Sequence, residues 1–289
     1  MLALTILTGM LTAAGLQQTD TLISVPPGSR LVMESFRGHV TINGWDRDEM
    51  RVEGDHSRRT YFDVDRSGRT MRIRADSWGG PAEVDYEIFA PASMDIDIRG
   101  TFVSADIDGV EGEVRIYTTM GSINVRGGGS VVRAETVNGS VTVEDAIAEV
   151  VASSTNGSVT VTNVRGDITA SSVSGSVWLE GIESSGVTAE TTSGSVHYDG
   201  TIEDGGRYTL STHSGSVVLA MPENVNASFG VSVFSGNLDT EFPVTVTGTR
   251  RRGAPINFTI GDGSARVELQ SFSGDVELIR RRSGRRRGR

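Results

Sequence analysis

The sequence predicts an all-β protein built as a single-stranded parallel β-solenoid, with right-handed coils of about 18–21 residues and a β-rich cap at each end. Three observations predict this fold. A glycine-containing phrase recurs at a nearly fixed interval, apolar and polar residues alternate within each repeat, and no segment after the N-terminal apolar run has helical periodicity. The 36 Gly among 289 residues exceed the usual share of about 7%, which is typical of a chain with many tight turns.

The chain begins with an apolar run, residues 1–16, which ends near the small residues Ala13, Ala14 and Gly15. This run is too short to span a bilayer as a helix, which needs about 20 residues, but it has the length of a signal-peptide hydrophobic region. We therefore expect a signal peptide at 1–16 and an exported protein, periplasmic or at the cell surface. Because no Lys or Arg follows Met1, an N-terminal strand of the fold or a mis-assigned start is the alternative.

Residues 21–100 contain alternating apolar and polar runs, such as 40–42 and 84–89, separated by Pro-Pro-Gly and Gly-Gly-Pro turns. We find no copy of the 18-residue phrase in this region. Because the open end of a solenoid exposes unpaired strand edges, it needs a capping structure. We expect residues 21–100 to form a β-rich N-terminal cap.

Residues 101–240 carry the repeats, whose glycines lie 18, 18, 18, 19, 21 and 21 residues apart. Each repeat contains Asn/Ser-Gly-Ser-Val or a close variant, and a second alternating phrase keeps the same offset. We expect each glycine to supply the positive φ of a sharp turn. The predicted turn glycines are Gly121, Gly139, Gly157, Gly175, Gly194, Gly215, Gly236 and Gly274.

A chain of β-hairpins is the alternative fold, because Asn-Gly between β-rich runs favours a hairpin turn. Hairpins, however, do not require equal residues at a fixed offset. In this chain one apolar column runs through positions 123, 141, 159, 177, 196, 217 and 238, and an alanine column runs through 134, 152, 170 and 189. Parallel coils stacked about 4.8 Å apart account for both columns, and the alanines indicate a narrow interior.

The C-terminal part has two segments. We interpret residues 241–279 as capping coils that close the stack, and residues 280–289 as a disordered tail. The alternative for the tail is a tether to an anionic membrane or polymer. The tail arginines are Arg280, Arg281, Arg282, Arg285, Arg286, Arg287 and Arg289. Since the formal net charge of the chain is -10 and the acidic residues lie outside this tail, we expect no nucleic acid partner.

Two longer runs and the serial repeats resemble one protein family. The runs are ESFRGHVTINGWDRDEMRVE at residues 34–53 and IGDGSARVELQSFSGDVEL at residues 260–278. Together with the Asn/Ser-Gly-Ser-Val phrases they resemble the DUF4097 family of putative adhesins, over about residues 21–280. The resemblance implies a bacterial envelope protein with a β-helical body and no established catalytic residue. Some members of the family are tied to envelope-stress systems, so the resemblance also implies a sensing role as an alternative.

The residues offer little reactive chemistry. The chain has no Cys and no Lys, so it lacks thiol nucleophiles, cysteine metal sites and a P-loop lysine. Its four His show no metal-ligand spacing, and we predict no catalytic residue, no metal site and no cofactor. One surface candidate is the pair Trp178 and His197, expected to be outward neighbours on adjacent coils, with Tyr198 turned inward. An exposed indole there could stack on a sugar, or it could simply cover a corner of the coil.

These observations predict a non-enzymatic, secreted or periplasmic scaffold for adhesion or interaction in the bacterial cell envelope. We expect a monomer or weak oligomer whose partner is an envelope protein or glycan. One alternative is an envelope-stress sensor or regulatory accessory protein, and another is a structural polymer assembled through coil ends. A polysaccharide-active enzyme is a further alternative, which requires carboxylates converging in a cleft.

Overall fold

A computed structural model describes residues 16–243 and 255–281, with 24 β-strands in these ranges. None of the elements in the described ranges is a helix with the length and hydropathy needed to cross a membrane. The chain forms two compact units, Met1–Gly157 and Ser158–Arg289. Residues 1–15 of the predicted signal peptide lie outside the described residues, whereas Leu16 is the first residue of a strand.

The first unit contains twelve of these strands. They are β1 (Leu16–Ser24), β2 (Arg30–Trp45), β3 (Glu49–Ser57), β4 (Thr60–Ser67), β5 (Thr70–Ser77), β6 (Val84–Pro91), β7 (Asp95–Val110), β8 (Val114–Met120), β9 (Ile123–Gly127), β10 (Val131–Asn138), β11 (Val141–Glu144) and β12 (Glu149–Asn156).

Parallel coils stacked in register form the body of this unit. The longer strand of each coil pairs with the longer strand of the next, in the order β7, β8, β10 and β12, and Val132 lies opposite both Val114 and Val150. The shorter strands β9 and β11 pair in the same way, with Ile123 opposite Val141. Apolar side chains alternate inward along both sets of strands and form the core. The predicted β-solenoid is confirmed for this unit.

The solenoid begins earlier than the sequence repeats indicated. β2 already contains both strands of a coil and pairs in parallel with β7 along most of its length, from Arg30 opposite Asp95 to Asn43 opposite Asp108. The first coil and the second are thus offset by 65 residues, because β3 to β6 are inserted between them. The cap itself consists of β1, β3, β4, β5 and β6, in which β1–β3, β3–β6 and β4–β5 pair antiparallel.

The second unit contains the other twelve strands. They are β13 (Val159–Thr162), β14 (Ile168–Ser174), β15 (Val177–Ile182), β16 (Gly186–Ser193), β17 (Val196–Gly200), β18 (Arg207–Ser214), β19 (Val217–Met221), β20 (Ala227–Ser235), β21 (Leu238–Thr240), β22 (Ile256–Ile260), β23 (Ala265–Ser273) and β24 (Val276–Arg280).

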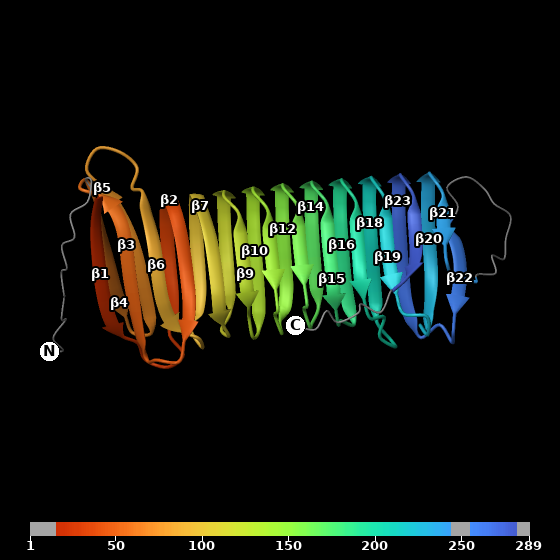
Figure 1. The fold of residues 1–289 in the computed structure, drawn as a ribbon, viewed down its shortest axis with the longest axis horizontal. Helices are drawn as coiled ribbons and strands as arrows, with labels where there is room; N and C mark the ends of the chain where they lie inside the picture. The colour runs from red at the N-terminus through yellow and green to blue at the C-terminus, as the bar shows by residue number, and fades with distance from the viewer. Residues whose placement is uncertain (1–15, 244–254, 282–289) are drawn as a thin grey trace, which may run out of the picture. The chain divides into compact units, whose positions relative to one another are not determined.

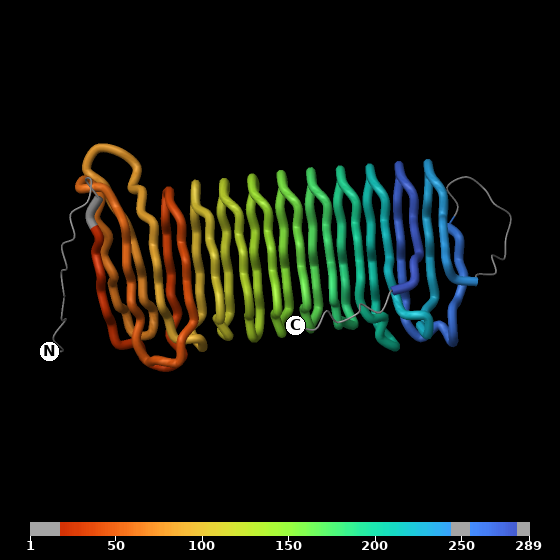
Figure 2. Tube along the Cα trace, viewed as in Figure 1, coloured from red at the N-terminus to blue at the C-terminus, as the bar shows by residue number. Residues whose placement is uncertain are grey.

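The last coil in the sequence is not the last coil in the stack of the second unit. β23 pairs in parallel with β18 on one side and with β20 on the other, and β24 lies likewise between β19 and β21 (Figure 1, Figure 2). β22 pairs antiparallel with the other edge of β20, and the turn at 261–264 then carries the chain across the start of β20. We expected residues 241–279 to close the stack, but the closing elements are β20, β21 and β22.

Each coil bends where its longer strand leads into its shorter one, and a glycine and a hydroxyl cooperate at that bend. A Cβ on Gly139 would lie 2.1 Å from the carbonyl oxygen of Gly121 in the preceding coil. The same oxygen accepts a hydrogen bond from the hydroxyl of Thr136 at 3.0 Å. The inward Ser or Thr and the glycine of the same repeat therefore contact the same carbonyl oxygen. The equivalent hydrogen bond is made in their own coils by Ser154, Thr191, Thr212 and Ser271. Positive φ values of 143° to 159° occur at Gly121, Gly139, Gly157, Gly194, Gly215, Gly236 and Gly274.

The interior of the second unit widens along the chain as the repeat lengthens. The alanine column continues through Ala170 and Ala189 and is then replaced by Leu210. Two buried tyrosines, Tyr198 and Tyr208, fill the wider coils with their ring centroids 5.9 Å apart. Their hydroxyl groups donate hydrogen bonds to the carbonyl oxygens of Thr201 and Ser184, so the polar ends are satisfied.

We expect the stability of the protein to fall as the pH rises above about 10, the ordinary pKa of tyrosine. Burial raises the pKa of both Tyr198 and Tyr208, so they stay protonated in the folded chain while the unfolded chain ionises. The stability that they contribute is complete below the unfolded pKa and is lost above it. Urea unfolding at a series of alkaline pH values measures this loss, which should be smaller in the variant Tyr198→Phe/Tyr208→Phe. If the free energy of unfolding falls equally with pH in the wild type and in the double variant, the expectation is wrong.

Candidate binding groove

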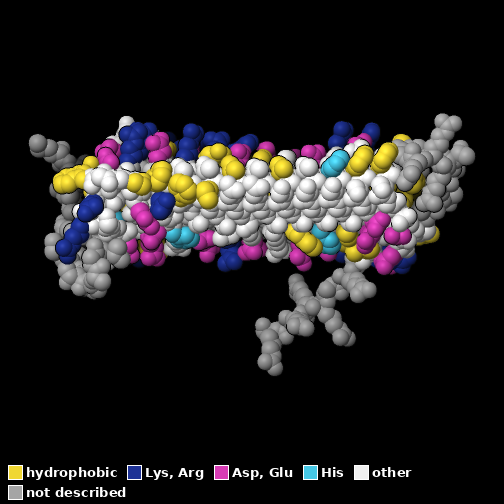
Figure 3. All heavy atoms as spheres, turned by 90° about the horizontal axis from the view of Figure 1, so that it is seen from above, with side chains coloured by type: hydrophobic (Ala, Val, Ile, Leu, Met, Phe, Trp, Pro, Cys, Tyr) yellow, Lys and Arg dark blue, Asp and Glu magenta, His cyan; other side chains and the backbone are white. Residues whose placement is uncertain are grey.

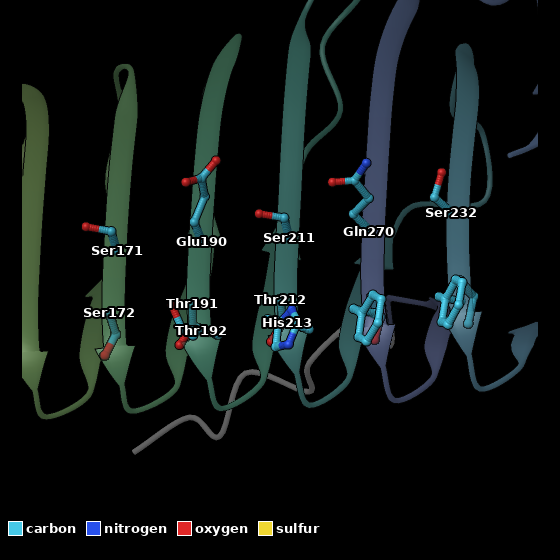
Figure 4. A pocket seen from close by; sticks show the side chains of 14 residues that line it. Ser171, Ser172, Glu190, Thr191, Thr192, Ser211, Thr212, His213, Ser232 and Gln270 are labelled. Carbon is cyan, nitrogen blue, oxygen red and sulfur yellow. The ribbon is translucent and has the colours of Figure 1, made fainter. Parts of the chain in front are cut away.

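A groove crosses five neighbouring strands on the outer surface of the second unit, with a volume of about 520 Å³. The strands are, in spatial order, β14, β16, β18, β23 and β20 (Figure 4). Three rows of side chains line the groove. The polar row consists of Ser171, Glu190, Ser211, Gln270 and Ser232. The floor consists of Ser172, Thr191, Thr212, Ser271 and Val233. The ladder row consists of Thr192, His213, Phe272 and Phe234.

Three stacked rings make the ladder row mainly aromatic. The ring centroids of His213 and Phe272 are 4.7 Å apart at an interplanar angle of 7°, and those of Phe272 and Phe234 are 4.6 Å apart at 5°. The rings belong to three adjacent strands, so the ladder keeps the spacing of the sheet. Phe234 and Phe272 are nevertheless 51% and 47% exposed. Stacking covers the ring faces, and the ring edges form an apolar strip along one side of the groove.

The polar row consists of side chains without partners among the residues that the structure describes. Within the described part of the chain, none of its five side chains forms a hydrogen bond or an ion pair with another residue. Some outward side chains elsewhere do bind one another across adjacent coils, as in Asn124 to Asp106 at 2.6 Å and Arg165 to Glu183 at 2.7 Å. The polar row therefore offers hydroxyl, carboxylate and carboxamide groups that are free to bind a ligand.

Side chains in the floor of the groove form hydrogen bonds that hold adjacent coils together. Thr191, Thr212 and Ser271 donate their hydroxyl hydrogens to glycine carbonyl oxygens of the preceding coil, at 2.7, 2.8 and 3.0 Å. The three central strands β16, β18 and β23 are paired on both sides, so their backbone groups are also engaged. The side-chain hydrogen-bond donors that are free for a ligand consequently lie in the two side rows.

The groove carries little charge. Glu190 is the only carboxylate among its lining residues, and no Arg lines it. The groove therefore lacks arginine side chains that would neutralise an anionic ligand. On the face of the protein that Figure 3 shows, charged side chains lie mainly along the two edges.

The structure brings the predicted pair Trp178 and His197 together, on a different side of the coil from the groove. They lie opposite each other on β15 and β17, with ring centroids 4.9 Å apart and an interplanar angle of 36°. Trp178 is 47% exposed, and its neighbour on the other side is the short side chain of Thr160. Tyr198 points inward, as the alternation indicates. A role of this pair in binding stays a prediction.

Two of the seven predicted tail arginines lie within the described residues and are held by the protein. Arg280 ends β24 and binds Glu223 at 2.8 Å, and Arg281 lies 2.6 Å from Asp199. The strand region thus extends into the segment expected to be disordered. Arg282, Arg285, Arg286, Arg287 and Arg289 lie outside the described residues, and their contact with an anionic surface stays a prediction.

The other titratable groups show no comparable arrangement. His39 lies 2.7 Å from Asp106, whose second oxygen binds Asn124, so this cluster is satisfied internally. Across the described ranges, we find no group of three or more His, Asp or Glu side chains placed to hold a metal ion.

Sequence reasoning did not find the aromatic ladder, although a signal for it is present. His213, Phe234 and Phe272 each stand two residues before the turn glycine of their repeat. The corresponding positions in the five serial repeats from Gly121 to Gly194 hold Thr or Val, so within the serial repeats the three aromatic residues mark the last coils. Reading the repeats by column at every position, and not only at the apolar ones, would have indicated this strip.

Stacked parallel coils with a glycine bend between their two strands define a β-solenoid protein. The chain belongs to the DUF4097 family, described as Toastrack DUF4097, whose model matches residues 29–279. This match confirms the resemblance found in the sequence. No protein of curated function matches the chain.

Several solved structures are similar to the chain at low identity. A putative adhesin from Parabacteroides distasonis is 12% identical, with 90% of this chain and 97% of that chain covered and a TM-score of 0.47. A putative adhesin from Parabacteroides merdae is 9% identical, with 91% and 96% covered and a TM-score of 0.47. A putative cell adhesion protein from Clostridium sporogenes is 8% identical, with 91% and 100% covered and a TM-score of 0.28. Likenesses at this level do not bear on the function of this chain.

Proposed function

We propose that this protein is a non-enzymatic interaction scaffold of the bacterial cell envelope, exported to the periplasm or cell surface, and that an extended partner lies in the groove. The observation that carries the proposal is the row of five unpaired polar side chains beside an exposed aromatic ladder. A binding site needs both features, because apolar contact supplies affinity and directed polar groups supply orientation. The export step rests on residues 1–16 alone.

The composition of the groove also supports a binding role over a catalytic one. Glycoside hydrolysis generally uses two carboxyl groups on opposite sides of the scissile bond. Glu190 has no second carboxylate among the lining residues of the groove, and it forms no ion pair with His213, which also lines the groove. The groove therefore suits holding a ligand better than cleaving it.

We expect the full-length protein to sediment with envelope fractions of the source bacterium, and the variant Phe234→Ala/Phe272→Ala to bind at least about fivefold less, because exposed aromatic residues dominate such contacts. Tyr117→Ala is the matched control, since Tyr117 is 48% exposed but is not among the residues that line the groove. Thermal melting should show that all variants are folded. Equal sedimentation of the double variant and the wild type would reject the groove, and a loss seen only in Trp178→Ala would assign binding to the Trp178–His197 pair instead.

A further inference from the structure

Within the proposed binding function, on which this inference rests, we propose that the groove binds an unbranched neutral glycan along the direction in which the coils stack. The proposal concerns the chemical class of the ligand and its orientation. It follows from the length of the groove, the chemistry of its two side rows and its lack of positive charge.

The length and direction of the groove favour an extended chain. The lining side chains come from five adjacent strands, and four strand spacings of about 4.8 Å give a length of roughly 19 Å. Both side rows run across the strands, so equivalent contacts recur at each coil. A linear polymer of similar units can use this repetition, whereas a compact small molecule would meet only one or two members of each row.

The two side rows match the two kinds of surface on a sugar ring. Ser211 and Ser232 can both donate and accept hydrogen bonds, as sugar hydroxyls do, and the carboxamide of Gln270 offers both functions as well. On the opposite side, the edges of His213, Phe272 and Phe234 form an apolar strip on which the C–H surface of a sugar can be buried. A chain of linked neutral sugars presents both surfaces in every unit.

Charge and backbone pairing argue against the other extended ligands. An anionic polymer would meet Glu190 and find no Arg in the groove. An extended peptide usually binds by pairing with a free strand edge, but β16, β18 and β23 are paired on both sides. The floor residues Thr212 and Ser271 also donate their hydroxyl hydrogens within the fold, so no backbone-binding row remains for a peptide.

Isothermal titration of the full-length protein with three neutral hexasaccharides, cellohexaose, laminarihexaose and chitohexaose, tests the proposal. We expect at least one to bind, with affinity about tenfold weaker in Phe234→Ala/Phe272→Ala and in Gln270→Ala, as expected for losing one buried contact or a directed hydrogen bond. Tyr117→Ala should leave the affinity unchanged. The anionic hexamer of galacturonate should bind more weakly than the neutral ligands.

The outcomes separate this inference from the proposed function. If none of the three neutral hexasaccharides binds, or if the galacturonate hexamer binds more tightly in the groove, the neutral glycan is the wrong ligand class. The proposed scaffold function still stands in that case, provided that Phe234→Ala/Phe272→Ala weakens binding to envelope fractions. If the double variant affects neither experiment, both the function and the ligand class are rejected.

Discussion

Gly215→Ala should destabilise the protein by about 3–5 kcal/mol, although it adds only one methyl group. A Cβ at this position would lie 2.0 Å from the backbone carbonyl oxygen of Gly194. That oxygen also accepts the hydrogen bond from the Thr212 hydroxyl at 2.8 Å, so it cannot move without breaking a second contact. Gly215 has a φ of 144°, which an L-residue with a side chain rarely adopts. Strain, collision and a lost part-buried hydrogen bond therefore act together, and the fall in unfolding free energy in urea would measure their sum.

Two other glycines provide matched controls for this prediction. Gly205 has a φ of 76° but no atom within 4 Å of the position that an alanine methyl group would occupy, so Gly205→Ala should cost only about 1 kcal/mol of backbone strain. Gly80 has neither a positive φ nor a close neighbour, and Gly80→Ala should change the free energy of unfolding by less than about 0.5 kcal/mol. If Gly215→Ala lowers the free energy of unfolding no more than Gly205→Ala does, the repeat glycine is not required for the close approach of adjacent coils.

The fold could be predicted from the sequence where its signal is periodic. Columns of equal residues at an offset near 18 indicated parallel coils, and Val132 lies opposite Val114 and Val150 as those columns require. The first coil was not identified from the sequence, because an insertion separates it from the second coil. Its segment Gly38-His39-Val40-Thr41-Ile42 nevertheless repeats the pattern of Gly121-Ser122-Ile123-Asn124-Val125. Periodicity identifies a coil only while its neighbour in space is also its neighbour in sequence.

The same limit explains why the order of the last coils could not be predicted. Gly215, Gly236 and Gly274 occupy one column, and so do Val217, Leu238 and Val276, so any order of the three coils satisfies the repeat pattern equally well. The deciding element is β22, which pairs antiparallel with β20 and sends the chain across it. Antiparallel β22 has no counterpart in the repeats, and its effect is seen only in three dimensions.

The candidate site was missed for a related reason. The groove is formed by outward side chains that lie side by side on adjacent coils. The sequence of a single repeat does not show which coils are adjacent. Ser211 and Gln270 look like ordinary polar positions in the sequence, but they become neighbours because β23 lies beside β18. Trp178 and His197, by contrast, lie on consecutive coils, and their contact could be predicted by counting.

Val276→Asp should destabilise the protein by about 4 kcal/mol or more, because it places an unpaired charge in the core. Val276 is 0% exposed and lies between Val217 of β19 and Leu238 of β21. Leu238→Asp introduces the same residue in the same column but should cost only about 1 kcal/mol, because Leu238 belongs to the closing coil and is partly exposed. Stacking in sequence order would place Leu238 inside and Val276 at the end, so it predicts the reverse ranking. Urea unfolding of the two variants distinguishes these orders.

Disulfide formation tests the same order of coils without depending on stability. Ser214 and Ser273 are partners on the adjacent strands β18 and β23, at a spacing of about 4.8 Å that suits a disulfide, so Ser214→Cys/Ser273→Cys should oxidise readily. Ser235 of β20 is the partner of Ser273, which separates it from Ser214 by two strand spacings, or roughly 9.6 Å, so Ser214→Cys/Ser235→Cys should stay reduced. Because the chain contains no Cys, each variant can form only one intramolecular bond. Oxidation of the second pair with the first left reduced would show that the coils stack in sequence order, and the expected ranking of Val276→Asp and Leu238→Asp would then reverse as well.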